Sequence, residues 1–357
     1  MTKQDYSLLG PDARHAVEVG LAAADWYHSD IPRKEMKELM QRSDGPAIRD
    51  TLILFGCMAL FAGIAIYLWP SWASAPWWLA YGVLYGSAMD SRWHECGHGT
   101  AFKTRWMNDA VYQVASFMMV RNPVAWRWSH ARHHTDTIIV GRDPEIVAMR
   151  PPALLRIIGN FLGLSDTLNG WRRMIVNAMG RLDPEEASFI PVQEHPKVIL
   201  VARIWVLIYA ATIVLAIWMQ SVLPFMLIGL PRFYGAWHHV LTGIMQHAGL
   251  AENVIDHRLN SRTVYINPIS RFIYWNMNYH IEHHMFPMVP YHQLPRLHDR
   301  IKADLPVPNM SMISAYAEII PALLRQTREP EFFLRRELPA TARAYREDLH
   351  NAVSPAQ

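Results

Sequence analysis

The stretch from Tyr279 to Pro287 reads YHIEHHMFP and places three histidines within five residues. On a helix, spacings of three and four residues bring their imidazoles to one face. Two earlier stretches repeat this pattern, HECGH at 94–98 and HARHH at 130–134. The three clusters together hold eight histidines: His94, His98, His130, His133, His134, His280, His283 and His284.

The clustering indicates a metal site. Imidazole is a common ligand of iron, zinc, copper and nickel, and the ring binds through the lone pair of a neutral nitrogen. Without a metal, every buried imidazole of the three clusters would need a hydrogen-bond partner of its own. Eight ligands also exceed the four that one tetrahedral ion takes. We therefore expect a centre with two metal ions.

Composition indicates a membrane protein with large aqueous parts. The chain has 357 residues, of which 51% are apolar, and its mean hydropathy is zero. Its two cysteines, Cys57 and Cys96, are too few for a disulfide framework or a cysteine-ligated iron–sulfur cluster, so the electron carrier must be a separate protein. No GxGxxG or GxxxxGK[ST] motif is present, so nucleotide binding is unsupported, and we expect no nucleic acid partner.

Hydrophobic runs predict four membrane crossings. No charged side chain occurs between residues 51 and 89, and the sequence PSWASAP at 70–76 divides this run into two helices. The four predicted transmembrane helices span about 51–69, 77–97, 198–219 and 222–246. We expect three regions along the chain: a polar leader over 1–50, the catalytic domain over 51–325, and a charged, helical tail over 326–357.

Basic residues set the predicted orientation. All 34 lysines and arginines lie outside the two hairpin turns, at 70–76 and 220–222. Because positive residues favour the cytoplasmic side, both termini and the histidine clusters are expected there. The sequence therefore predicts an all-α integral membrane protein of a bacterial inner membrane. Four transmembrane helices would hold the metal site at the cytoplasmic surface of the membrane.

The motifs HECGH, HARHH and HIEHH, in this order and separated by membrane hairpins, resemble the three histidine boxes of the membrane fatty acid desaturase and hydroxylase superfamily. The resemblance covers roughly residues 50–300 and is far more specific than a single HxxxH. It implies a fold of four membrane helices under a cytoplasmic helical cap. Within this cap it implies a non-haem centre of two iron ions, which uses dioxygen as co-substrate to attack an unactivated C–H bond. It also implies nine iron ligands, the eight box histidines and one more, for which we choose His247, with His238 and His239 as competitors.

Carboxylates near the boxes are predicted to orient the ligands. A histidine that binds a metal usually donates its other N–H to a carboxylate or carbonyl oxygen. Glu95 and Glu282 lie inside boxes and are the favoured catalytic-site residues, and Asp136 and Asp143 are further candidates.

Oxygen-dependent C–H oxidation is the predicted reaction, with fatty acyl desaturation as the first choice. The alternative is a hydroxylase or O-demethylating monooxygenase acting on a small molecule, because the run from QHAGLAEN to HQLPRLH is similar to bacterial desaturase-like oxygenases, including that of rhizopine catabolism. A remote alternative is a zinc membrane protease, since HECGH also satisfies HExxH. The expected partners are the lipid bilayer, a fatty acyl or small-molecule substrate, and a ferredoxin with its reductase.

Overall fold

The computed structural model describes residues 4–346. Over this range the chain is helical, and its extended pairing is limited to two isolated bridges, Thr263 with Tyr279 and Val264 with Asn309. The prediction of an all-α fold is confirmed for the described residues.

The first helical hairpin forms where the sequence lacks charge. Two short helices, α1 (Pro11–Glu18) and α2 (Arg33–Leu39), precede the long helix α3 (Asp44–Tyr67). The chain turns through η1 (Trp72–Ser74) and returns as α4 (Ala75–Val83). Helix α3 begins within the predicted leader. Hydropathy does not predict this start, because it marks apolar residues and not helix boundaries.

The returning helix continues to the first histidine box. A π-helical turn, η2 (Leu84–Ala88), joins α4 to α5 (Met89–His98) without a break. Gly99, in the left-handed conformation with φ of 69°, ends α5 directly after the box. Single π turns inside helices are frequent at functional sites, and this one ends at Ala88, less than two turns before His94.

The middle of the chain forms the second box and the second hairpin. The helices are α6 (Arg105–Met119), α7 (Pro123–Thr135), α8 (Leu154–Asn160), α9 (Leu164–Ala178), α10 (Pro184–Phe189), η3 (Val192–Glu194) and α11 (His195–Trp218). The fourth predicted crossing is present as three pieces, α12 (Leu223–Leu227), α13 (Pro231–Tyr234) and α14 (Trp237–His247). The break before α13 falls at Pro231, as a proline that cannot donate a backbone hydrogen bond predicts.

The remaining helices form the cap. They are α15 (His257–Asn260), α16 (Pro268–Tyr274), α17 (His280–Met285), η4 (Tyr291–Gln293), α18 (Leu294–Ile301), η5 (Lys302–Asp304) and α19 (Met312–Gln326). The largest apolar core joins the cap to the hairpins, since Met285 and Tyr291 from the cap pack in one cluster with Met89 and Trp93 of α5.

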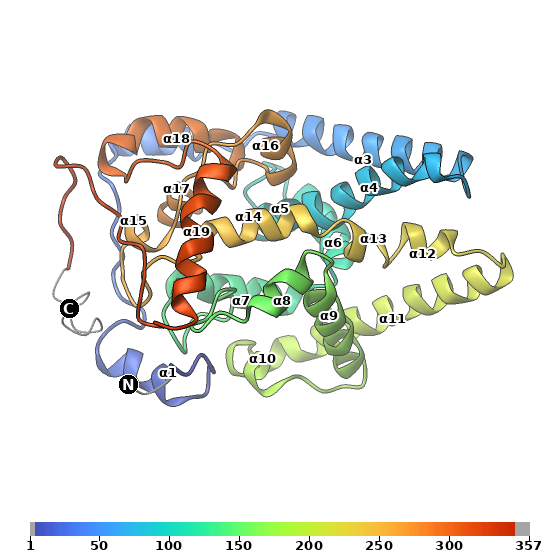
Figure 1. Cartoon of the computed structure of the whole chain (residues 1–357), viewed down its shortest axis with the longest axis horizontal. Coiled ribbons are helices and arrows are strands. Elements are labelled where there is room, and N and C mark those ends of the chain that lie inside the picture. Colours follow the sequence, from blue (N-terminus) through green and yellow to red (C-terminus); the bar gives the residue numbers. More distant parts are fainter. Residues whose placement is uncertain (1–3, 347–357) are drawn as a thin grey trace.

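Among the described residues, two helical stretches are long and apolar enough to cross a membrane, Arg33–Tyr67 and Val192–Trp218. They contain the first and third predicted crossings, and four crossings remain a prediction. The hairpins α3–α4 and α11–α12 project from the same end of the molecule, away from α1 and α18 (Figure 1).

The prediction of a helical tail is wrong for residues 327–346. Helix α19 ends at Gln326, and the chain beyond it is irregular. Pro330 and Pro339 disfavour a helix there, and the backbone N–H of Leu334 donates to the Gly249 carbonyl instead (2.7 Å). The last part of the predicted tail, 347–357, lies outside the described residues.

Candidate metal centre

Four helices supply the predicted ligands. Helix α5 carries His94 and His98 at i, i+4, and α7 and α17 carry the second and third boxes. Helix α7 has a well-formed start, because the Asn122 side chain accepts hydrogen bonds from the backbone N–H groups of Val124 and Ala125. His247 is the last residue of α14. These four helices meet in the cap next to the hairpins.

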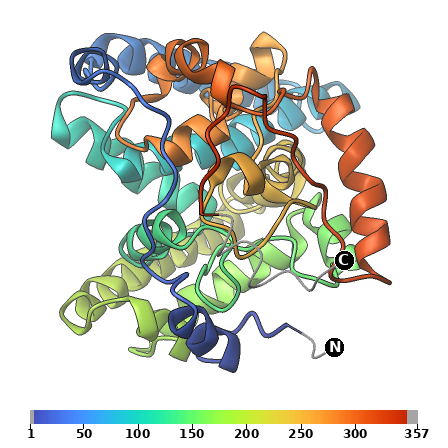
Figure 2. The ribbon, with the colours of Figure 1, turned by 90° about the vertical axis from the view of Figure 1, so that its left-hand side faces the viewer.

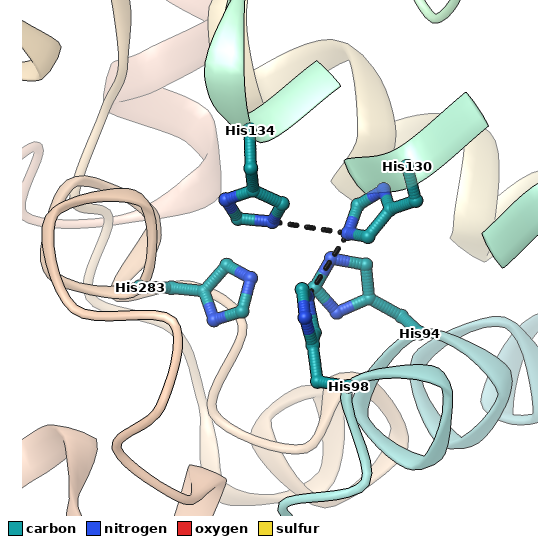
Figure 3. A group of neighbouring side chains, drawn as sticks. All are labelled: His94, His98, His130, His134 and His283. Atoms are coloured by element: carbon teal, nitrogen blue, oxygen red, sulfur yellow. Dashed lines mark hydrogen bonds between the residues drawn. The ribbon is translucent and has the colours of Figure 1, made fainter. Parts of the chain in front are cut away.

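The first group of histidines comes from all three boxes. It contains His94, His98, His130, His134 and His283, and one ring nitrogen of each lies within 4.8 Å of the corresponding nitrogen of every other member. The imidazoles point toward one another from α5, α7 and α17 (Figure 3). His130 Nε2 is 3.1 Å from the Nε2 atoms of both His98 and His134.

The second group contains His133, His247, His280 and His284, with the same spacing limit of 4.8 Å. His280 Nε2 lies 3.0 Å from the Nε2 atoms of both His247 and His284. The structure therefore brings the proposed ninth histidine together with the box histidines. The two competitors lie outside both groups, since His238 contacts Ser270 and His239 faces Asp90.

The two groups adjoin. The rings of His134 in the first group and His284 in the second are stacked with centroids 4.4 Å apart. His133 and His134 are consecutive residues of α7 that turn into different groups. This arrangement fits two neighbouring metal sites and not one.

Hydrogen bonds at the outer ring nitrogens set the tautomers. His130 Nδ1 bonds Glu145 (2.9 Å) and His133 Nδ1 bonds Asp143 (2.8 Å). His247 Nδ1 bonds the Asn260 carbonyl oxygen at 2.8 Å. Each acceptor holds the proton on Nδ1, so that the Nε2 lone pair faces the group.

Burial keeps the rings of the third box neutral. Burial, together with the neighbouring imidazoles, holds the pKa of His280, His283 and His284 well below its ordinary value. Within residues 4–346, neither ring nitrogen of His94 or His283 has a hydrogen-bond partner, although both side chains are buried. Buried polar atoms rarely remain unpaired, so these nitrogens fit metal ligands. All-imidazole donor sets suit iron, zinc, copper and nickel.

The prediction that Glu95 and Glu282 accept hydrogen bonds from ligating histidines is wrong. Glu95 Oε1 accepts from the Thr100 hydroxyl (2.8 Å) and the Tyr291 backbone N–H (3.0 Å). Glu282 accepts from the Thr263 hydroxyl (2.6 Å) and bonds the ring of His298. Glu95 therefore joins α5 to η4, and Glu282 joins α17 to Thr263 and to α18.

The acidic residues that touch the ligands follow the second box. Asp143, one of the candidates, bonds His133, whereas Asp136 accepts from Arg142 and from the backbone of Ala23. Glu145, which bonds His130, was missed by the sequence reasoning. The available signal in the sequence was its position, because only one proline separates Glu145 from the candidate Asp143. Burial raises the pKa of Glu145 to about 7.

The metalloprotease alternative disagrees with this geometry. A zinc protease needs the Glu of HExxH free to act on a water beside the metal. Here the Glu95 carboxylate is fully buried and held by Thr100 and Tyr291. The two histidines of the HECGH motif belong to a group of five and not to a three-ligand site with an open position.

Aromatic packing fixes the first group from behind. The Trp126 ring stacks on His130 with centroids 4.2 Å apart and packs on Trp93 at 3.6 Å. Gly97 makes this approach possible, because a Cβ there would lie 2.2 Å from the Trp126 ring.

The family model for fatty acid desaturase matches residues 67–316, which includes every residue of the two histidine groups. The chain belongs to the fatty acid desaturase family. This is a family of oxidoreductases, and the predicted resemblance is thereby confirmed at the level of the family.

Curated relatives are similar over parts of their length. The Delta(12)-fatty-acid desaturase of Arabidopsis thaliana is 27% identical over 135 residues, which are 37% of this chain and 35% of the relative. The chloroplastic omega-3 fatty acid desaturase of Ricinus communis is 23% identical over 71% of this chain and 58% of the relative. The sn-2 acyl-lipid omega-3 desaturase (ferredoxin), chloroplastic, of Helianthus annuus is 23% identical over 74% of this chain and 62% of the relative. The chain thus matches less than two thirds of each relative's length.

Proposed function

We propose that this protein is a membrane-bound desaturase that oxidises C–H bonds of fatty acyl chains with dioxygen at a centre of two iron ions. The observation that carries the proposal is the pair of adjoining histidine groups, within a chain of the fatty acid desaturase family. The first group would hold one ion and the second group the other. When bound, the two irons supply the oxidising chemistry that removes hydrogen from an unactivated carbon.

The residues of the chain have three tasks in this proposal. The Nε2 atoms of both groups hold the metals, and Asp143, Glu145 and Asn260 hold the protons on the outer nitrogens. Six of the nine histidines are buried, which limits the access of bulk water to a strongly oxidising centre, as this chemistry requires. The family relatives named above are desaturases of fatty acids or acyl lipids, which supports an acyl substrate.

The exposed apolar surface of the hairpins supports a membrane location. On α11, Leu207 and Ile217 are 69% and 71% exposed, and on α3, Leu52 is 67% exposed. Long helices that expose such side chains are typical of lipid-facing surfaces. We infer that both hairpins lie in a bacterial inner membrane, with the cap and the histidine groups on the cytoplasmic side.

A ferredoxin with its reductase is the proposed electron source. The two cysteines, Cys57 and Cys96, provide no iron–sulfur cluster, so the electrons must come from another protein. The name of the Helianthus annuus relative specifies ferredoxin, which supports this class of carrier.

The test is a mass-spectrometric comparison of host lipids with and without the protein, co-expressed with a ferredoxin and its reductase. We expect new unsaturated acyl chains that are absent with the His283→Ala variant. New hydroxylated chains would show that the reaction is hydroxylation and not desaturation. Unchanged lipids from an iron-loaded wild-type protein would refute the acyl substrate.

A second candidate is oxidation of a small polar molecule, either hydroxylation or O-demethylation. Asp90, one helical turn before His94, lies 3.1 Å from Arg121 and 3.6 Å from the His239 ring. Asp166 lies 4.0 Å from the same ring. A hydrocarbon chain offers no partner to such groups, whereas a hydroxylated ring or an amine would. Release of formaldehyde from methyl ethers of cyclic polyols, with the His283→Ala variant as control, would favour this reaction.

A further inference from the structure

A stack of aromatic rings leads from the second histidine group toward the surface. The rings of Trp26 and His257 are nearly parallel, with centroids 4.2 Å apart and an angle of 9°. The His257 ring in turn lies 5.0 Å from the ring of His284, a member of the second group. Two ring contacts therefore connect Trp26 to a proposed iron ligand.

The two ends of this stack differ in exposure. His257 is 1% exposed, and its Nδ1 atom has no hydrogen-bond partner in the described part of the chain. Trp26 is only partly buried, and its indole N–H donates to the Thr135 carbonyl oxygen (2.9 Å). The stack thus runs from a buried ring beside the ligands to a ring that solvent reaches.

Trp26 lies on the end of the molecule opposite the hairpins. The segment between α1 and α2 crosses this end as an extended strap (Figure 2). The hairpins α3–α4 and α11–α12 project from the other end (Figure 1). If the hairpins lie in the bilayer, a water-soluble protein can approach the strap.

Neighbouring contacts hold the stack rigidly. The backbone N–H of Tyr27 donates to the Ile255 carbonyl oxygen (3.1 Å), which joins the strap to the loop before α15. The Arg258 guanidinium lies 3.4 Å above the Tyr27 ring and pairs with Asp256 (2.8 Å). Residues on both sides of the Trp26–His257 contact are therefore fixed, so the ring distance is set by the fold.

The other aromatic contact to the ligands does not reach solvent. Trp126 stacks on His130 and packs on Trp93, but the two indoles are 7% and 3% exposed. That pair lies between helices α5, α6 and α7. Of the two aromatic contacts described, the one that ends at Trp26 is thus the one with a partly exposed ring.

We propose that Trp26 and His257 form the electron route to the metal centre, and that a small one-electron carrier protein docks on the strap over Trp26. This inference rests on the proposed function and deepens it. In each transfer the reduced carrier loses one electron, and a ferric ion held by the second group becomes ferrous. Two such transfers, with two protons from water, balance the reduction of dioxygen in one desaturation.

Charge beside Trp26 fits a carrier with an acidic surface. Arg132 lies one helical turn before Thr135, the residue whose carbonyl receives the Trp26 N–H. The Arg132 Nε atom has no hydrogen-bond partner among the described residues. An acidic carrier would supply a partner for this guanidinium, and attraction between opposite charges speeds docking.

The test measures electron transfer separately from catalysis. Iron-loaded wild-type, Trp26→Leu and Trp26→Phe proteins are mixed anaerobically with reduced ferredoxin, and ferredoxin oxidation is followed by its absorbance. Trp106→Leu, which removes a tryptophan that is 65% exposed on α6, is the matched control. We expect Trp26→Leu to slow ferredoxin oxidation by an order of magnitude, Trp26→Phe to slow it less, and Trp106→Leu to leave it unchanged.

Two further measurements, the rate of reduction by dithionite and the amount of bound iron, distinguish an electron route from a structural role. We expect both to be unchanged in Trp26→Leu, because a small reductant does not need the strap. Equal slowing with ferredoxin and dithionite would overturn the route, as would wild-type rates with ferredoxin in Trp26→Leu. A wild-type protein that holds no iron would refute the proposed function itself, which is a separate result.

Binding of the carrier tests the docking surface without turnover. We expect Arg132→Gln to raise the Kd of immobilised ferredoxin several-fold at low salt and to weaken the dependence of Kd on salt. Trp106→Leu should leave the Kd unchanged. An unaltered Kd and salt dependence in Arg132→Gln would overturn docking beside Trp26.

Discussion

Replacing Asp143 by Asn should weaken metal binding at the second histidine group while leaving the fold intact. The Asp143 carboxylate is buried and accepts three hydrogen bonds. Oδ2 accepts from His133 Nδ1 and from the Ile138 backbone N–H, both at 2.8 Å, and Oδ1 accepts from the Glu145 backbone N–H at 2.8 Å. An asparagine has the same shape but offers one oxygen and one NH2 group.

In either orientation of the asparagine amide, its NH2 group faces another hydrogen-bond donor. If the NH2 group faces Glu145, one buried backbone N–H is left unpaired, at a cost of about 1–3 kcal/mol. If it faces His133, the ring must accept at Nδ1, so the proton moves to Nε2 and the lone pair directed at the metal is lost. Loss of such an outer partner typically lowers metal affinity about 10- to 100-fold, or roughly 1.4–2.7 kcal/mol.

The assay is competition for ferrous iron between the protein and a chelator of known affinity, under anaerobic conditions, with iron counted per chain. We expect Asp143→Asn to retain one iron more tightly than the other, whereas wild type retains both. Asp136→Asn is the matched control, because this carboxylate is equally buried but pairs with Arg142 and Ala23 and with no histidine. Wild-type iron affinity in Asp143→Asn, or an equal loss in Asp136→Asn, would refute the reasoning.

Three further predictions concern stability. A Cβ on Gly235 would lie 1.8 Å from the Gly82 carbonyl oxygen, so Gly235→Ala should destabilise the folded protein by more than the about 1–3 kcal/mol of ordinary overpacking. Gly56→Ala is the control, because a Cβ there meets nothing within 4 Å, and it should leave thermal unfolding in detergent nearly unchanged. Burial alone would raise the pKa of Glu318, but the hydrogen bonds and positive charges of Arg262 and Arg336 together outweigh burial and lower the pKa below 4.5. This stabilisation is present above pH 4.5 and is lost as pH falls through the lowered pKa, so the difference in Tm between wild type and Glu318→Gln should shrink on acidification. Removal of iron by a chelator should lower the Tm, and anaerobic addition of ferrous iron should restore it, because a metal that binds only the folded chain stabilises it; an unchanged Tm would contradict a structural contribution from the metals.

Much of the fold followed from where the sequence lacks charge. The uncharged run from 51 to 89 and the prolines at its centre predicted the first hairpin, and Pro231 predicted the break before α13. The start of α3 at Asp44 was not predictable from hydropathy, because its first turns are polar yet remain helical. The irregular chain after Gln326 depends on its contact with Gly249, a partner distant in sequence that propensity does not reveal.

The histidine groups were partly predictable. Spacings of three and four residues placed each box on one helical face, but they did not reveal how the boxes divide between two groups. His133 and His134 turn into different groups because consecutive residues of a helix point in directions about 100° apart. His247 has no such spacing to the boxes, so it was found through the resemblance alone.

The error at Glu95 and Glu282 has a physical cause that the sequence already contained. Glu95 follows His94 directly, and Glu282 immediately precedes His283, and adjacent residues of a helix do not face each other. A carboxylate inside a box must therefore point away from the ligands that flank it. An acceptor for the outer nitrogen has to come from a segment that folds back over the helix, as the loop carrying Asp143 and Glu145 does over α7. At the second box, the acidic residues that bond the ligands are thus those of the following loop.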